Sequence, residues 1–364
     1  MTILAFFLWS LLKVAVVTVV MLLGVAYTVL LERKLVGRIQ NRWGPSRVGP
    51  FGLLQPLVDG AKSFLKEDII PTSVYRPLYL LAPILALGCA LISIGVVPFG
   101  EPNLELHDFA AIFGPWFASK IPLGLHMFQI SDVNIGLLVI LGVTSIGVYG
   151  VALAGWSSNN KYALLGSLRA SAQLVSYELA LGLSLVGVVM RAGSLNLRVI
   201  VEQQATRGIL TWNIFGGLQF LAFFIYLIAA YAETNRSPFD LVEAESELAG
   251  GYNVEYSSMK FAMFFMAEYA NMITVGCVAT LLFLGGWTSP LGNLLGPFEN
   301  QFVNAFLSIF WFVLKVFSFL FLYVWVRGTL PRFRYDQLMN FGWRILMPLA
   351  ILNIIGTSLW LAYR

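Results

Sequence analysis

The sequence predicts an all-α integral membrane protein with eight transmembrane helices. Hydrophobic residues make up 58% of its 364 residues and charged residues only 12%, about half the charged share of a typical soluble domain. Apolar runs long enough to cross a bilayer recur along the whole chain. We therefore treat residues 1–364 as a single polytopic membrane domain. The expected spans are 5–31, 78–98, 131–155, 170–190, 213–232, 262–284, 305–326 and 342–362.

The distribution of basic residues predicts which loops face the cytoplasm. Sixteen of the 23 lysine and arginine residues lie in four alternate segments between spans, against five on the opposite side. Loops rich in Lys and Arg stay on the inner side of a membrane. This predicts that both chain ends lie on the outer, periplasmic side. The predicted cytoplasmic segments are 32–77, 156–169, 233–261 and 327–344.

The first cytoplasmic loop, 32–77, predicts a short amphipathic helix in the plane of the membrane surface. Apolar residues from Leu53 to Leu65 recur at helical spacing, while Asp59 and Lys62 occupy the other face. Asp59 and Lys62 are three residues apart and can form a surface pair. Two interpretations stay open: an ordinary interfacial anchor, or a lateral entrance through which a lipid-soluble molecule passes beneath the helix.

Cysteine and histidine are too scarce for a redox centre. An iron–sulfur cluster normally takes four cysteine ligands, and the chain has only Cys89 and Cys277, both within expected spans. His107 and His126 both lie in the outer loop 99–130, so no expected helix offers an intramembrane haem pair. No glycine-rich nucleotide loop follows a predicted strand. We expect no cofactor or metal to be bound by this chain itself.

The cytoplasmic segment 233–261 concentrates negative charge, with six acidic residues against Arg236 and Lys260. Acidic groups this close cannot all ionise without cost unless a base compensates them, and we expect them to titrate as a set. A solvated charged face is the simpler interpretation, and a site that handles protons is the other. The acids are Glu233, Asp240, Glu243, Glu245, Glu247 and Glu255.

An ionisable residue within a span costs roughly 2.5–3.5 kcal/mol near a helix centre, so each one needs a reason. Glu178 and Glu268 lie at comparable depths in the fourth and sixth spans. A carboxyl group in a low-dielectric environment favours its neutral form, which allows proton exchange near neutral pH. We therefore favour a proton relay over purely structural hydrogen bonds between helices. For Asp132 and Lys315 we favour anchoring roles.

The last cytoplasmic segment, 327–344, is basic. It sets Arg327, Arg332 and Arg334 beside Asp336. The tendency of basic residues to stay inside explains most of them, although an acidic headgroup, a quinone carbonyl or a partner's carboxylate could also use them.

Five segments together carry a family pattern, in order from about residue 27 to 344. They are ERKLVGRIQNRWGPSRVGPFGLLQPLVDGAKSFLKED, AGWSSNNKYALLGSLRASAQLVSYE, AETNRSPFDLVEAESELAGGYNVEYSS, FFMAEYANM and PRFRYDQLM. This pattern resembles the quinone-site membrane subunit of respiratory complex I, which is called the H subunit in the bacterial NADH:quinone oxidoreductase and subunit 1 in the mitochondrial enzyme. The resemblance implies the heel of a membrane arm that couples quinone reduction to proton translocation.

The resemblance also implies two sets of site residues. The quinone passage and chamber wall would include Glu32, Arg33, Asp59, Lys62, Phe264, Phe265, Arg327, Arg332 and Arg334. A carboxylate relay would include Glu178, Glu233, Glu243, Glu245, Glu247 and Glu268. One position departs from the pattern, because Ser145 stands in the third span where some relatives carry a glutamate.

The resemblance further implies quinone as substrate, with FMN and iron–sulfur clusters held by partner subunits. The expected partners are other membrane-arm and peripheral-arm subunits and membrane lipids, but not nucleic acid. The expected location is the bacterial cytoplasmic membrane, with the mitochondrial inner membrane as second choice. Two alternatives stay open: the membrane subunit of an energy-converting hydrogenase-type complex, and a free-standing proton-coupled transporter. The well-matched entrance segment argues against the first, and the lack of two related halves argues against the second.

Overall fold

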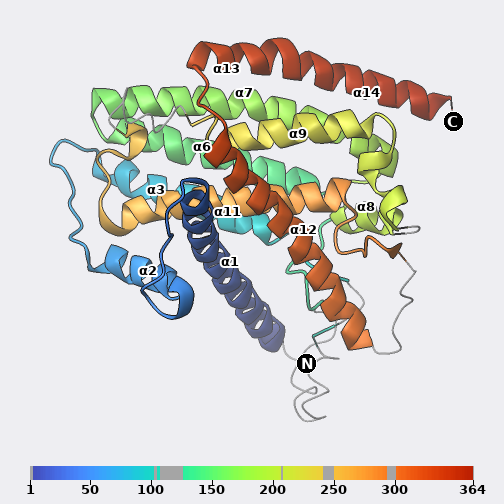
Figure 1. The fold of residues 1–364 in the computed structure, drawn as a ribbon, viewed down its shortest axis with the longest axis horizontal. Coiled ribbons are helices and arrows are strands. Elements are labelled where there is room, and N and C mark those ends of the chain that lie inside the picture. The colour runs from blue at the N-terminus through green and yellow to red at the C-terminus, as the bar shows by residue number, and fades with distance from the viewer. Residues whose placement is uncertain are drawn as a thin grey trace.

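The computed structural model describes residues 3–101, 105–106, 126–205, 208–240, 250–292 and 301–363. Over these ranges the chain forms helices joined by turns (Figure 1). Seven of the described helices are long and apolar enough to cross a membrane, which confirms the all-helical, multi-span architecture. The total of eight crossings and the side on which the termini lie stay predictions. Three of the expected relay acids, Glu243, Glu245 and Glu247, lie outside the described residues.

Five helices form the centre of the fold (Figure 1). They are α3 (Arg76–Ile94), α6 (Gly136–Ser157), α7 (Lys161–Ala192), α9 (Gln219–Glu233) and α11 (Ser258–Phe283). α3 packs against both α6 and α11, and α7 packs against both α6 and α9. Small residues permit this close approach: a Cβ atom on Gly150 of α6 would lie 2.9 Å from the Ala86 nitrogen of α3.

The remaining long helices surround this centre. α1 (Ile3–Ile39) and α12 (Gln301–Thr329) cross it obliquely and pack against α11 (Figure 1). α13 (Tyr335–Phe341) and a π-helical turn at Gly342–Leu346 lead into α14 (Met347–Ala362), which packs against α7. α8 (Leu197–Gln204) is a short helix that contacts α7 and α11.

The short helix predicted in the first loop is present as α2 (Gln55–Leu65), which lies against α1 and α11. Its place in the plane of the membrane surface stays a prediction. The side chain of Ser258, at the start of α11, donates hydrogen bonds to the carbonyl oxygens of Ser63 and Lys66 at 2.9 and 3.0 Å. Just beyond, Lys260 Nζ lies 2.9 Å from a carboxylate oxygen of Asp68. These contacts attach the end of α2 to the helix that carries Glu268.

The predicted pairing of Asp59 with Lys62 is wrong. Asp59 instead accepts a hydrogen bond from Arg33 Nη1 at 2.7 Å and another from Gln55 Nε2 at 2.9 Å. The reason is tertiary: α2 packs against α1, so a guanidinium group from α1 reaches the carboxylate that sequence spacing alone would give to Lys62.

The fifth expected span begins later than predicted. α9 starts at Gln219 instead of residue 213 and has 15 residues. Two short 3₁₀ turns precede it, at Gly208–Thr211 and Asn213–Phe215. Gly217 then adopts φ +74°, a left-handed conformation that interrupts a helix. The apolar run is therefore divided between turns and a shorter helix.

Lys315, within α12, has a structural role. Its ammonium group donates to the carbonyl oxygens of Leu284, Gly286 and Thr288 at 2.7, 2.8 and 2.8 Å, and it lies 4.3 Å from the centre of the Trp212 ring. These carbonyl groups follow the C-terminus of α11, where a cation is favoured. This agrees with the anchoring role expected for Lys315.

We expect Lys315→Met to lower the free energy of unfolding by roughly 2–4 kcal/mol, because three carbonyl groups lose a charged donor. Thermal unfolding of the assembled membrane protein measures this. Activity per folded molecule should stay unchanged, and Lys161→Met at the exposed start of α7 serves as the control. Lost activity without lost stability would contradict the structural role.

Candidate functional site

A pocket of about 510 Å³ opens between α1, α2 and α11, within the range of typical ligand sites. Much of its wall is apolar, formed by side chains such as Val29 and Phe265. Arg236, Tyr269 and Arg327 also line it. An apolar molecule with a polar end group therefore suits this pocket.

A second groove of about 610 Å³ lies between α1 and α12 and is lined almost entirely by aliphatic and aromatic side chains. Its lining residues on α1 include Val20 and Gly24, whereas Leu22 and Ala26 line the first pocket. Residues two apart in a helix point about 160° away from each other, so the two pockets lie on different sides of α1. Among the residues that the structure describes, Lys34 is the one charged residue that lines this groove. We therefore place the candidate site in the pocket beside α2, which contacts the ionic cluster described next.

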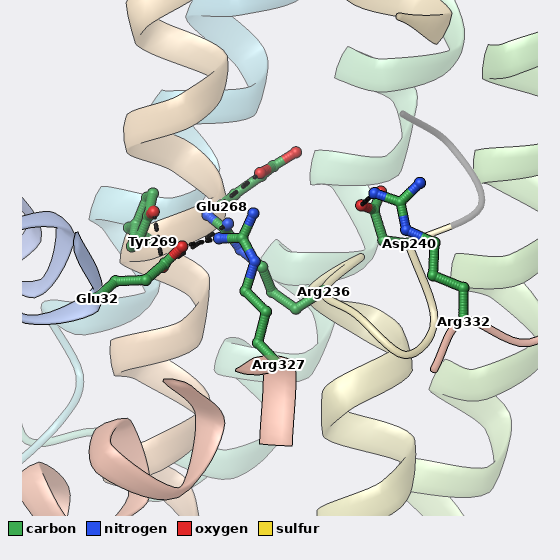
Figure 2. A network of polar contacts seen from close by, with 7 residues as sticks. All are labelled: Glu32, Arg236, Asp240, Glu268, Tyr269, Arg327 and Arg332. Atoms are coloured by element: carbon green, nitrogen blue, oxygen red, sulfur yellow. Dashed lines mark hydrogen bonds and ion pairs between the residues drawn. The ribbon is translucent and has the colours of Figure 1, made fainter. Parts of the chain in front are cut away.

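An ionic cluster centred on Arg236 lies beside the pocket (Figure 2). The Arg236 guanidinium group lies 3.9 Å from Glu32, 3.6 Å from Glu268 and 4.1 Å above the Tyr269 ring. Arg327 forms an ion pair with Glu32, which also accepts a hydrogen bond from the Tyr269 hydroxyl group at 2.9 Å. Arg236 is only 6% exposed. Two arginines thus compensate two carboxylates in a place where unpaired charge would be costly.

The segment after α9 positions Arg236. Gln173 of α7 donates hydrogen bonds to the carbonyl oxygens of Ala232 and Phe239 at 2.8 and 2.9 Å, on either side of Arg236. The Phe239 amide donates to the Arg236 carbonyl oxygen at 2.8 Å and closes a turn. Asn235 adopts φ +49°, a conformation that asparagine tolerates better than most residues. The chain therefore turns tightly and directs Arg236 toward α1 and α11.

A small polar cavity lies deeper in the bundle. Its lining includes Glu178 of α7, Glu233 of α9 and Glu268 of α11, together with Tyr252 and Asn271. The volume open to the centres of water molecules is about 50 Å³, enough for roughly three or four of them. The three expected relay acids that the structure describes therefore line one water-sized cavity.

Glu268 connects the cavity with the pocket. Its Oε2 atom lies 3.6 Å from Arg236 Nη2, and Arg236 lines the pocket. Its Oε1 atom accepts a hydrogen bond from the Tyr252 hydroxyl group at 3.1 Å, and Tyr252 lines the cavity. One carboxyl group therefore faces a basic group on the pocket side and an acidic cavity on the other.

The turn after the acidic loop positions Tyr252. Gly250 and Gly251 adopt φ values of +108° and +66°, which favour glycine. Tyr256, farther along, stacks on Tyr79 of α3 with ring centres 4.2 Å apart and donates to its carbonyl oxygen at 3.3 Å. Burial raises the pKa of Tyr256 to about 12, so the phenol stays a neutral donor. The segment is thereby fixed to the central helices.

The structure divides the two phenylalanines expected at the passage. Phe265 lines the pocket, whereas Phe264 lines the acidic cavity. Successive helical residues point about 100° apart, which turns Phe264 toward the cavity while Phe265 faces the pocket. Lys62 is likewise absent from the pocket lining, where α2 contributes Asp59 instead. We therefore omit Phe264 and Lys62 from the proposed passage.

Two expected arginines also lie away from the pocket lining. Arg332 forms an ion pair with the buried Asp240 at 3.0 Å (Figure 2). Arg334 pairs with Asp336 at 3.1 Å on an exposed surface. Of the four arginines expected at the passage, Arg33 and Arg327 line the pocket that the structure describes.

Three central residues were not predicted from the sequence: Arg236, Tyr252 and Tyr269. A signal was present for Arg236, because it is one of only two bases in the acidic segment 233–261. Tyr269 directly follows Glu268, but the two point in different directions from α11. Neither tyrosine carried a pattern that separates it from the other twelve in the chain.

The family model described as NADH dehydrogenase matches residues 12–358. The chain belongs to this family. Its relatives include an NADH-quinone oxidoreductase H subunit of Koribacter versatilis, 62% identical over 99% of this chain and 98% of that protein. An H subunit of Geobacter metallireducens is 48% identical over 98% of this chain and 96% of that protein. The H subunit of Cupriavidus necator is 44% identical over 97% and 92%. The family resemblance expected from the sequence is thus confirmed.

Proposed function

We propose that this chain is the heel subunit of the membrane arm of proton-pumping NADH:quinone oxidoreductase. It forms a quinone passage and couples quinone reduction to proton translocation. Near full-length relatives named as the H subunit of that enzyme support the assignment. Seven apolar helices and bacterial relatives support a multi-pass protein of the bacterial cytoplasmic membrane. The observation that carries the mechanism is Glu268, placed between Arg236 and the acidic cavity.

In this proposal, quinone enters from the lipid through the pocket between α1, α2 and α11. The apolar wall accommodates the tail, and Arg33, Asp59, Arg236 and Arg327 supply the polar lining. Electrons come from partner subunits that hold FMN and iron–sulfur clusters, because two cysteines cannot ligate a cluster. The other membrane-arm and peripheral-arm subunits complete the chamber.

Coupling follows from electrostatics. Quinone reduction adds two electrons and two protons to form the neutral quinol, and drawing those protons from nearby acidic groups changes the charge beside the Arg236 cluster. Glu268 lies 3.6 Å from Arg236, so its affinity for a proton responds to that change. Water in the adjoining cavity then connects Glu268 with Glu233 and Glu178. We assign Glu243, Glu245 and Glu247 to the same relay on the resemblance alone.

The apolar pocket also helps to decide between the proposed function and the two alternative functions. A hydrogenase-type membrane subunit does not need an open apolar passage ending at an ionic cluster. A free-standing transporter would be expected to use two related, interrupted halves. The names of the relatives favour the quinone reductase over both.

Glu268→Gln tests the coupling role, because it keeps the shape of the side chain and removes its titration. In proteoliposomes containing the whole complex, we expect NADH-driven proton pumping to fall by about tenfold or more, since a positioned acid–base group contributes roughly 10²-fold or more. Glu202→Gln, in a surface pair with Arg198, is the control. A native gel verifies assembly. Normal pumping at the normal proton-to-electron ratio would contradict the proposal.

A further inference from the structure

Ser145 of α6 contacts two groups at once. Its Oγ atom lies 2.9 Å from the Leu141 carbonyl oxygen, and it is also hydrogen-bonded to Glu178 Oε1 of α7. A hydroxyl group has one proton and two lone pairs, so Ser145 cannot donate to both oxygens at full strength. Which of the two oxygens receives the Ser145 proton must depend on whether Glu178 is protonated.

Each protonation state of Glu178 has a complete hydrogen-bond arrangement. When Glu178 is ionised it can only accept, so the Ser145 hydroxyl group donates to it. When Glu178 is protonated, its O–H donates to Ser145 Oγ, and Ser145 turns its own proton to the Leu141 carbonyl oxygen. No donor is left unused in either state, and no heavy atom has to move.

The surroundings of the Leu141 carbonyl favour this exchange. The carbonyl oxygen also accepts a hydrogen bond from the Thr144 hydroxyl group at 2.9 Å. Because Thr144 keeps its hydrogen bond to this oxygen, the Leu141 carbonyl group is not left without a donor when Ser145 turns toward an ionised carboxylate. A hydrogen bond to a charged acceptor is also roughly twice as strong as one between neutral groups.

Charged neighbours reach the Glu178 region from other helices. Glu233 of α9 and Glu268 of α11 line the same cavity, and Tyr252 lines it from the turn after the acidic loop. On the sequences of α6 and α14 there is no carboxylate or basic residue. Ser145 is thus the hydroxyl group that α6 provides to Glu178 among the described contacts.

We infer that Ser145 is a positioning residue for Glu178, whose hydroxyl group reverses its hydrogen bond each time Glu178 gains or loses a proton. The inference rests on the proposed relay role of Glu178. Its consequence is that the carboxyl group stays directed toward α6 in both charge states, so proton transfer through the cavity requires no side-chain rearrangement there. Removal of the hydroxyl group should therefore slow transfer without removing the titrating group.

Infrared difference spectra of the purified whole complex, recorded over a pH series, test this directly. The carbonyl stretch of protonated Glu178 is assigned as the band that Glu178→Gln removes. We expect this band to shift in Ser145→Ala and to return toward its wild-type position in Ser145→Thr, which keeps a hydroxyl group. Pumping by Ser145→Ala should fall by roughly 3- to 10-fold, as expected for the net loss of one ordinary hydrogen bond.

Ser184→Ala is the matched control, because Ser184 of α7 is a buried hydroxyl group that donates to the Leu181 carbonyl oxygen and does not line the cavity. We expect no band shift from it. An unchanged Glu178 band in Ser145→Ala would overturn the inference, as would the absence of any protonated Glu178 band at every pH. Normal pumping by Glu178→Gln would contradict the relay role, while a band shift in Ser145→Ala would still support the hydrogen-bond exchange.

Discussion

Arg236→Gln should nearly abolish NADH:quinone reduction by the assembled complex. The substitution removes the positive charge that lies 3.9 Å from Glu32 and 3.6 Å from Glu268. Removing one member of a buried ion pair costs about 3–5 kcal/mol, since a carboxylate is left poorly compensated. A loss of 3 kcal/mol corresponds to roughly a 100-fold fall in rate when it acts on the rate-limiting step.

Two further variants separate the effects of charge and shape. Arg236→Lys restores the charge but not the planar group that lies over the Tyr269 ring, so we expect intermediate activity. Arg198→Gln removes a surface ion pair with Glu202. Such pairs contribute only about 0–1 kcal/mol to stability, so we expect this variant to keep wild-type quinone reduction. The measurement is quinone reduction compared with reduction of an artificial acceptor that takes electrons before the quinone step. Full quinone reduction by Arg236→Gln would show that the cluster is not part of the site.

Much of the fold could be predicted because the bilayer imposes a simple rule on the sequence. A span must be long and apolar, and seven described helices satisfy that rule. The amphipathic pattern of α2 was equally readable, since its polar and apolar faces differ. The start of α9 was not predicted, because Ile214, Phe215 and Leu218 extend the apolar run ahead of the helix. Two 3₁₀ turns and the left-handed conformation of Gly217 separate this stretch from the helix in the structure.

The sequence predicted which types of residue form the site better than it predicted the directions in which their side chains point. Glu178, Glu233 and Glu268 were singled out from composition and resemblance, and they do line one cavity. What sequence could not supply is which way each side chain points. Phe264 and Phe265 are neighbours in the chain but face different cavities. Contacts across helices, such as Arg33 with Asp59, depend on packing that no local pattern records.

Gly60→Phe should restrict the passage of long-tailed quinones. Gly60 lies on α2, lines the pocket, and has no heavy atom within 4 Å of an added Cβ. A phenyl ring there would occupy the pocket instead of displacing its wall. Replacing a glycine inside a helix should also preserve or stabilise α2, by up to about 0.5–1 kcal/mol for alanine. The expected result is a KM for a long-tailed quinone at least about tenfold higher, since a bulky group in an apolar site costs more than 1.4 kcal/mol.

Tail length provides the discriminating comparison. A quinone with a short tail should be affected less, because it needs less of the apolar wall that lies beneath α2. Gly60→Ala should behave like the wild type, since one methyl group fits the open space. Gly88→Phe on α3 is the matched control, because Gly88 also has open space around an added Cβ but does not line the pocket. If Gly60→Phe and Gly88→Phe gave the same KM for both quinones, the substrate would have to reach its site by another route than the pocket between α1, α2 and α11.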